Sequence, residues 1–204
     1  LHRVDRRQRQ MCISDSIKSS VKPVLYVGGG CLNSGLKASE ELIKFAELTN
    51  IPVTTTLHGL GCYPGNGKLS IGMLGMHGTY EANLAMHNCD LMINVGARFD
   101  DRITGRLDAF SPNSTKFHFD IDKSSINKNV NVDFSTNTDI AHALSALNLY
   151  IKSNNIEFNH NQISNWWGQI KEWQKTNCLN YEQGDEIIKP QHAIARLNEL
   201  TKNK

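Results

Sequence analysis

Five short segments of this sequence are rich in glycine or in polar and charged side chains. They are Gly28 to Gly30, Thr56 to Gly59, Gly75 to Gly78, Gly96 to Arg98 and Asp120 to Asp122. Glycines let a pyrophosphate approach the backbone N–H groups, and Arg98 offers a positive charge that can neutralise it. Asp120 or Asp122 can accept hydrogen bonds from ribose hydroxyls or from an adenine amino group. Together the segments predict a site for one extended nucleotide.

The usual dinucleotide fingerprint is absent. The triplet Gly28 to Gly30 is followed by Asn33 rather than by a third spaced glycine, and no acidic residue stands at the usual distance. Taken alone, the triplet is more typical of a plain tight turn. The prediction of a nucleotide site therefore depends on all five segments together.

Residues 57–78 contain seven glycines, too many for regular structure. His58 and His77 lie in this stretch, but neither has a cysteine or carboxylate at ligand spacing, so no zinc site is predicted. We expect each histidine to line the wall of the pocket and to offer hydrogen bonds there. Met76, between glycines, is expected to face the ligand, whereas Met73 is expected to fill the core.

A dense polar cluster, Asp100 to Arg102 and then Thr104 to Arg106, follows a predicted buried strand. Such charges often pair with one another in a solvated loop, and that alternative stays open. The position after a strand favours a functional role, because ligands of open parallel sheets bind at the carboxyl ends of the strands.

Alternating strand and helix patterns supply the elements that would position these segments. Val24 to Val27 is a short apolar run, residues 35–49 carry an apolar helical face, and residues 51–56 are β-branched. A strand, a helix and a strand at this spacing form a parallel βαβ unit. Further elements are predicted as a helix over 79–88, strands over 91–95 and 115–121, and a helix over 138–150. The predicted fold class is α/β, an open parallel Rossmann-like sheet flanked by helices, with a helical C-terminal connector.

The two ends of the chain differ from this middle part. Residues 1–20 are polar and carry arginines at positions 3, 6, 7 and 9, which predicts a solvated linker or frayed helix, with a basic contact arm as the alternative. Beyond residue 150 the three tryptophans are expected to pack on an amphipathic helix. The predicted divisions are a linker (1–20), a main domain (21–150), a connector (151–189) and the start of a further domain (190–204), cut inside a longer protein.

Composition places the chain among ordinary globular proteins, with 204 residues, 39% hydrophobic and 21% charged. Lys and Arg number 22 against 20 Asp and Glu, so the net charge of +2 gives no reason to expect nucleic acid as a partner. The five cysteines are scattered singly and the apolar runs are only strand length. We therefore expect reduced thiols, no membrane segment, and a soluble protein of the cytoplasm or of a plastid or mitochondrial matrix.

Three runs carry a resemblance to a known family. They are Leu74 to Asn83 (LGMHGTYEAN), Val95 to Leu107 (VGARFDDRITGRL), and Asp120 to Asp122 together with Ile126 to Asn129 (INKN). These runs resemble the central domain of the catalytic subunit of acetohydroxyacid synthase, also called acetolactate synthase. The similarity covers residues 21–150, and the second run separates this family from other thiamine-diphosphate enzymes.

The resemblance implies an enzyme of three domains that decarboxylates pyruvate on thiamine diphosphate and joins the hydroxyethyl unit to a second 2-keto acid. The product is a precursor of branched-chain amino acids. In that family the central domain holds FAD, whereas thiamine diphosphate and Mg²⁺ are bound through other domains. The implied partners are the two keto acids, a second copy of the full-length chain in a dimer, and a regulatory subunit.

The resemblance also implies roles for individual residues. FAD is expected to contact Gly28, Gly29, Gly30, Thr56, Leu57, His58, Leu74, Gly75, Met76, His77, Gly96, Ala97, Arg98, Asp100, Ile103, Asp120 and Ile121. Arg102 is expected to contact the carboxylate of the incoming keto acid, because a guanidinium fork suits a planar carboxylate, and Asp101 could hold it in place.

Parts of the family's catalytic machinery are missing from this sequence. The catalytic glutamate belongs to the preceding domain, and the lone Gly184-Asp185 does not complete the metal-binding motif of the following domain. We therefore expect no metal ligands here and no activity from this segment alone.

Two other functions stay open, a stand-alone nucleotide-dependent oxidoreductase and a non-catalytic nucleotide-binding module. An oxidoreductase needs a proton-transferring side chain beside its hydride acceptor, and no paired histidine and carboxylate is evident at a plausible site. A module would change its oligomeric state with nucleotide and without turnover.

Overall fold

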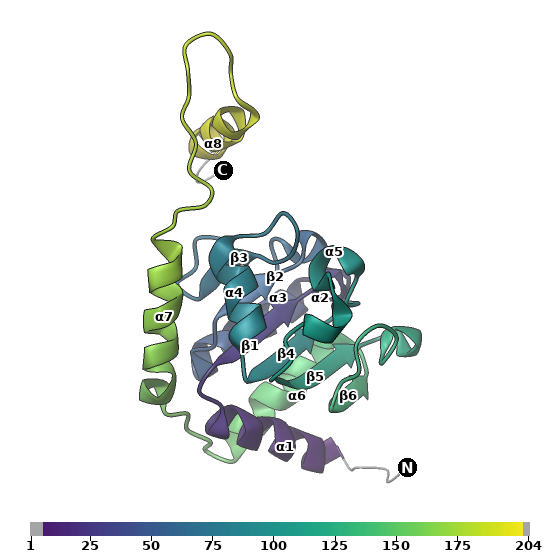
Figure 1. The fold of residues 1–204 in the computed structure, drawn as a ribbon. Helices are drawn as coiled ribbons and strands as arrows, with labels where there is room; N and C mark the ends of the chain where they lie inside the picture. The colour runs from purple at the N-terminus through teal and green to yellow at the C-terminus, as the bar shows by residue number, and fades with distance from the viewer. Residues whose placement is uncertain (1–5, 202–204) are drawn as a thin grey trace.

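Six parallel strands form one open sheet in the order β3-β2-β1-β4-β5-β6 (Figure 1). The computed structural model describes residues 6–201, and side chains from residue 10 onward. The strands are β1 (Pro23–Val27), β2 (Val53–Thr55), β3 (Ser70–Met73), β4 (Leu91–Val95), β5 (Thr115–Asp120) and β6 (Phe134–Asn137). This confirms the predicted α/β class. The strand order reverses between β1 and β4, and such a reversal opens a crevice at the carboxyl ends of the strands.

Helices connect and cover the strands. The α-helices are α1 (Arg6–Ser19), α2 (Gly29–Asn33), α3 (Leu36–Thr49), α4 (Tyr80–Asn88), α5 (Asp101–Thr104), α6 (Ile140–Ser153), α7 (Ser164–Gln174) and α8 (Pro190–Thr201). Short 3₁₀ turns are η1 (Leu57–Gly59), η2 (Leu107–Ala109), η3 (Lys123–Ser125) and η4 (His160–Ile163).

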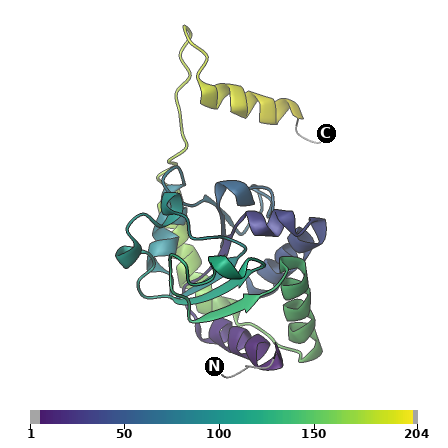
Figure 2. The same ribbon diagram turned by 90° about the vertical axis from the view of Figure 1, so that its right-hand side faces the viewer.

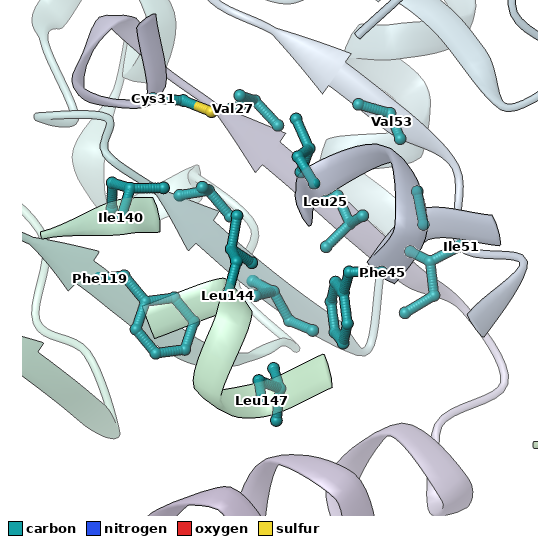
Figure 3. Packing of buried hydrophobic residues seen from close by; sticks show 14 of the residues in the cluster. Leu25, Val27, Cys31, Phe45, Ile51, Val53, Phe119, Ile140, Leu144 and Leu147 are labelled. Atoms are coloured by element: carbon teal, nitrogen blue, oxygen red, sulfur yellow. The ribbon is translucent and has the colours of Figure 1, made fainter. Parts of the chain in front are cut away.

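Both faces of the sheet are buried, so its central strands are apolar throughout. All five residues of β1 are buried. Leu25 and Val27 pack into the cluster formed with α3 and α6, where Phe45 and Leu144 meet (Figure 3). The alternate residues of β1 face α4 and α7 on the other side. A sheet covered by helices on both faces leaves only its two ends open to ligands.

The N-terminal segment was predicted as a solvated linker or frayed helix, and the structure shows a helix that packs against the sheet. Residues 6–19 form helix α1, and Ile13 and Ile17 are buried against the α3 and α6 side of the sheet. Two apolar residues four positions apart share one helical face, and this signal is too sparse to stand out from the surrounding polar sequence. The side chains of the arginines at positions 3, 6, 7 and 9 lie outside the described part.

Strands β3 and β6 were not predicted, and a short helix, α2, stands where a tight turn was expected. Strand β3 lies inside the glycine-rich stretch, and its Gly72 adopts a φ of +87°. Both strands are edge strands with exposed or half-buried residues. Edge strands lack the continuous apolar run that marks a central parallel strand, and the sequence therefore showed four of the six.

The tryptophans pack as expected. Trp166 on α7 is buried, its indole N–H donates to the carbonyl of Pro23 at 3.1 Å, and Trp173 meets its ring edge-on. Beyond α7 the chain runs through an exposed segment to α8, which stands apart from the sheet in two perpendicular views (Figures 1 and 2). No described residue of α8 is buried. All five cysteines are free thiols.

Candidate functional site

The loops at the carboxyl ends of β1, β2, β4 and β5 surround a cavity of about 690 Å³. Its volume lies in the usual range for small-molecule and cofactor sites. It is lined by Tyr26, Gly29, Gly30, Leu32, Asn33, Thr56, Leu57, His58, Gly96, Ala97, Arg98, Asp100, Arg102, Ile103, Asp120, Ile121, Asp122 and Ser125. Most of the predicted ligand residues are in this set, together with Arg102.

Glycines bring the backbones of neighbouring loops into contact at the centre of the cavity. A Cβ atom on Gly29 would lie 2.9 Å from Cβ of His58, and one on Gly30 would lie 2.9 Å from Cα of Gly96. Real Cβ atoms do not tolerate such distances, so the bare backbone itself forms this wall. Gly28 has a different place: it does not line the cavity, and a Cβ there would meet the Gly96 carbonyl oxygen at 2.3 Å.

Asn94, which sequence reasoning missed, holds the loop that leaves β4. Its side-chain amide donates to the Ala97 carbonyl at 2.7 Å, and its Oδ1 accepts from the Ala97 N–H at 2.8 Å. These bonds form a closed ring that fixes the wall formed by Gly96 and Ala97. The signal was present in the sequence, since a polar residue in the middle of a buried strand needs a hydrogen-bond partner.

Arg98, Asp100 and Arg102 lie on one side of the cavity. Arg98 forms an exposed ion pair with Asp100 at 2.8 Å. Arg102 is exposed on α5. Asp101 does not line the cavity; its Oδ1 accepts a hydrogen bond at 2.9 Å from the backbone N–H of Arg102 rather than from its guanidinium. The arginine side chain is thus left free to turn toward a ligand.

The predicted ligands from residue 74 to residue 77 support α5 instead of lining the cavity. Leu74 is buried, and the Met76 N–H donates to the carbonyl of Arg102 at 2.9 Å. Gly75 has a φ of +104° and its backbone is clamped on both sides by the Asn83 amide at 3.0 Å. The side chains of Met76 and His77 are exposed outside the cavity lining.

A histidine and a carboxylate meet beneath the cavity, a pairing that was not evident from the sequence. Nε2 of His118 lies 3.4 Å from Oδ2 of Asp120. The His118 side chain has no exposed surface, whereas the Asp120 side chain is 9% exposed and lines the cavity. Because His118 has no surface in the cavity, it cannot exchange protons with a ligand there as an oxidoreductase base would.

Tyr26 and Ser125 also line the cavity and were not expected from the sequence, whereas Asp122 was. Burial raises the pKa of Tyr26 above its usual value, and the nearby Asp100 carboxylate adds to the effect. Hydrogen bonds from Ser124 and Ser125 lower the pKa of Asp122, which therefore stays ionised at the cavity rim. Tyr26 and Ser125 lack glycine neighbours or a charge, and only the fold brings them here.

Comparison with known proteins identifies the family. The family described as "Thiamine pyrophosphate enzyme, central domain" matches residues 12–147, more than half of the chain. This chain belongs to the thiamine pyrophosphate enzyme central-domain family. The matched region runs from α1 to α6 and includes the whole sheet and every residue that lines the cavity.

Several relatives of this chain are named acetolactate synthases. The acetolactate synthase large subunit of Buchnera aphidicola subsp. Acyrthosiphon pisum is 45% identical over 89% of this chain and 31% of its own length. Acetolactate synthase isozyme 3 large subunit of Escherichia coli is 41% identical over 92% of this chain and 32% of its own. Acetolactate synthase 3, chloroplastic, of Brassica napus is 45% identical over 92% of this chain and 28% of its own. This chain spans about a third of these relatives.

The described part of this central domain contributes no metal centre by itself. Among the described residues, no group of three or more His, Cys, Asp or Glu side chains could hold a metal ion. In the same residues, no helix is long and apolar enough to span a bilayer.

Proposed function

We propose that the cavity binds FAD and that the chain serves as the central domain, residues 21–150, of a 2-keto acid carboligase of the acetolactate synthase type. The complete enzyme would decarboxylate pyruvate and condense the product with a second 2-keto acid to give a 2-acetohydroxy acid. The observation that carries the proposal is that loops from four strands, far apart in sequence, line one continuous cavity at the sheet's carboxyl edge. The relatives' names supply the reaction.

The residues of the cavity suit a flavin dinucleotide. Gly29 and Gly30 offer bare backbone to a pyrophosphate, and Arg98 offers a positive charge. At the β5 end, Asp120 and Asp122 offer acceptors for ribose hydroxyls or an adenine amino group. When bound, FAD would supply an isoalloxazine ring, although carboligation transfers no net electrons.

Arg102 would act on substrate rather than on the flavin. Its guanidinium is exposed at the cavity wall, where a planar carboxylate of a keto acid could be held by two parallel hydrogen bonds. Thiamine diphosphate and Mg²⁺ would come from parts of the enzyme outside this chain. We further propose that the complete enzyme acts as a homodimer and associates with a regulatory subunit. We propose the cytoplasm or an organelle matrix as its location in the cell.

Two substitutions in the complete enzyme test these roles. Arg102→Ala removes the carboxylate contact, so we expect carboligation to fall about a hundredfold or more while flavin remains bound. Asp120→Ala removes an acceptor for the adenosine end, so we expect weaker flavin retention, measured by absorbance at the flavin band after gel filtration. If Arg102→Ala strips the flavin and leaves coupling kinetics intact, the role assigned to Arg102 is wrong.

The wild-type protein separates the proposal from its alternatives. We expect bound flavin and carboligation of pyruvate without net reduction of the flavin. Steady reduction of FAD by a nicotinamide nucleotide would indicate an oxidoreductase, and a nucleotide-dependent change of oligomeric state without turnover would indicate a non-catalytic module.

A further inference from the structure

A row of polar residues crosses the sheet close to the carboxyl ends of the strands. Strand pairing aligns Thr54 with Tyr26, Tyr26 with Asn94, Asn94 with His118, and His118 with Ser135. The first four are buried. Burying a polar group costs free energy unless the group makes hydrogen bonds. The burial of each member of the row therefore requires an explanation.

Backbone contacts explain two members of the row, whereas the hydroxyl of Tyr26 and the imidazole of His118 have no hydrogen-bond partner among the described residues. Thr54 donates to the carbonyl of Gly72 at 3.0 Å, and Asn94 closes the ring with Ala97 described above. His118 is different. Among the described residues, neither of its ring nitrogens has a hydrogen-bond partner, and its side chain has no exposed surface. Oδ2 of Asp120 lies 3.4 Å from its Nε2.

The surroundings of His118 limit what its ring can do. The ring of Phe99 meets the imidazole edge-on, with ring centroids 5.2 Å apart. Lys116, two positions earlier on the same strand, directs its ammonium to the carbonyls of Ser111 and Ser114 instead. The Asp120 carboxylate is therefore the charged group with which the His118 imidazole can form a hydrogen bond.

Asp120 is held at both oxygens. Its Oδ1 accepts from the N–H of Asp122 at 2.8 Å, and its Oδ2 faces Nε2 of His118. The exposed remainder of the carboxylate lines the cavity. Fixing both oxygens would aim the remaining lone pairs at a ligand, as a fixed outer partner does for a binding group.

We propose that His118 is a positioning residue for the nucleotide-binding carboxylate Asp120. The inference rests on the proposed function, because it takes Asp120 as an acceptor for the adenosine end of the ligand. In its neutral form the imidazole would carry its proton on Nε2 and direct it toward Oδ2 of Asp120, because that oxygen faces Nε2 at 3.4 Å. Ligand binding draws the carboxylate and imidazole into a shorter hydrogen bond, since such contacts are often long in the free protein.

Matched substitutions test whether the hydrogen bond or only the bulk of the ring matters. Binding of ADP and of FAD to the purified protein is measured by isothermal titration. His118→Leu fills the space without a donor, and we expect it to weaken ADP binding about tenfold. His118→Gln restores an N–H donor, so we expect binding within about twofold of the wild-type protein. Ser135→Ala, at the next position of the row, is the control and leaves the affinity unchanged.

A spectroscopic readout separates positioning from packing. In ¹⁵N-labelled protein, the His118 ring is expected to show the Nε2–H tautomer and a downfield movement of that proton when ADP is added. Thermal melting of each variant verifies that it is folded. Equal affinities for His118→Leu and the wild-type protein, or equally weakened binding in His118→Leu and His118→Gln, would overturn the inference. Failure of the wild-type protein to bind ADP or FAD would instead overturn the proposed function.

Discussion

The carboxylate of Asp139 links Ser34, at the edge of the site, to the start of helix α6. Its Oδ1 accepts from the N–H of His142 at 3.1 Å and so caps α6, while its Oδ2 accepts from the hydroxyl of Ser34 at 2.7 Å. The hydrogen bond from Ser34 is the main cause that lowers the pKa of Asp139 below 3.8, and the N–H of His142 adds to it. A lowered carboxyl pKa means that the ionised form stabilises the folded state.

Asp139→Ala should lower the free energy of unfolding by about 1 kcal/mol at neutral pH, because the cap is lost. Since the pKa is lowered on folding, the stabilisation is fully present above pH 3.8 and is lost as the pH falls through the folded-state pKa. Urea unfolding of both proteins at neutral pH and near pH 3 measures the difference. Asp139→Asn, which caps but does not titrate, is the control. A penalty for alanine that is equally large at acid pH would contradict this explanation.

At the scale of elements, glycines decide how closely β1 and β4 approach at their tips. Gly28 donates its N–H to the Val95 carbonyl at 2.9 Å, and an added Cβ would lie 2.3 Å from the carbonyl oxygen of Gly96 and 2.5 Å from Cα of Ala97. The obstacle is backbone, which cannot rotate away. Gly28 therefore lets the tips of β1 and β4 pack closely beside the cavity.

Gly28→Ala should destabilise the fold by about 1–3 kcal/mol, the usual cost of forcing extra atoms into a packed region. Gly168→Ala is the matched control, because Gly168 lies within α7, is exposed, and has open space around an added Cβ. There we expect a gain of about 0.5–1 kcal/mol from helix propensity. Thermal or urea unfolding measures both. Equal effects of the two substitutions would show that close approach at Gly28 is unimportant.

At the scale of the whole molecule, the cavity and the C-terminal helix are separate. All residues that line the cavity precede residue 126, and α8 buries none of its described residues. The connecting segment, which includes Lys189, is exposed. Removal of α8 should therefore leave the sheet and the cavity intact.

Limited digestion with the protease Glu-C, which cleaves after glutamate, should cut after the exposed Glu186 before it cuts within the sheet. Cleavage requires exposed backbone that can leave its regular structure. Mass spectrometry identifies the fragment, and titration with FAD shows whether it still binds with the affinity of the uncut protein. Early cleavage within residues 23–120, or loss of FAD binding on removal of α8, would contradict this division.

Burial determines which elements of the fold could be predicted from the sequence. Val24 to Val27 and Leu91 to Val95 were predicted as strands because a central parallel strand, covered on both faces, is apolar without interruption. The helices with a clear apolar stripe, α3 and α6, were predicted for the same reason. Edge strands β3 and β6, and the packing of α1 through its two buried isoleucines, were missed because partial burial leaves few apolar residues in the sequence.

For the candidate site, the sequence alone determined which kinds of residue stand at the strand ends: glycines, arginines and carboxylates that suit a nucleotide. Only the tertiary structure decided which of them share a cavity, placing Gly29 and Asp120 on its wall and Leu74 and Gly75 beneath α5. It also revealed His118 beneath Asp120. The physical reason is that local pattern reflects burial along one element, whereas the convergence of loops depends on strand order and register, which contacts between distant residues determine.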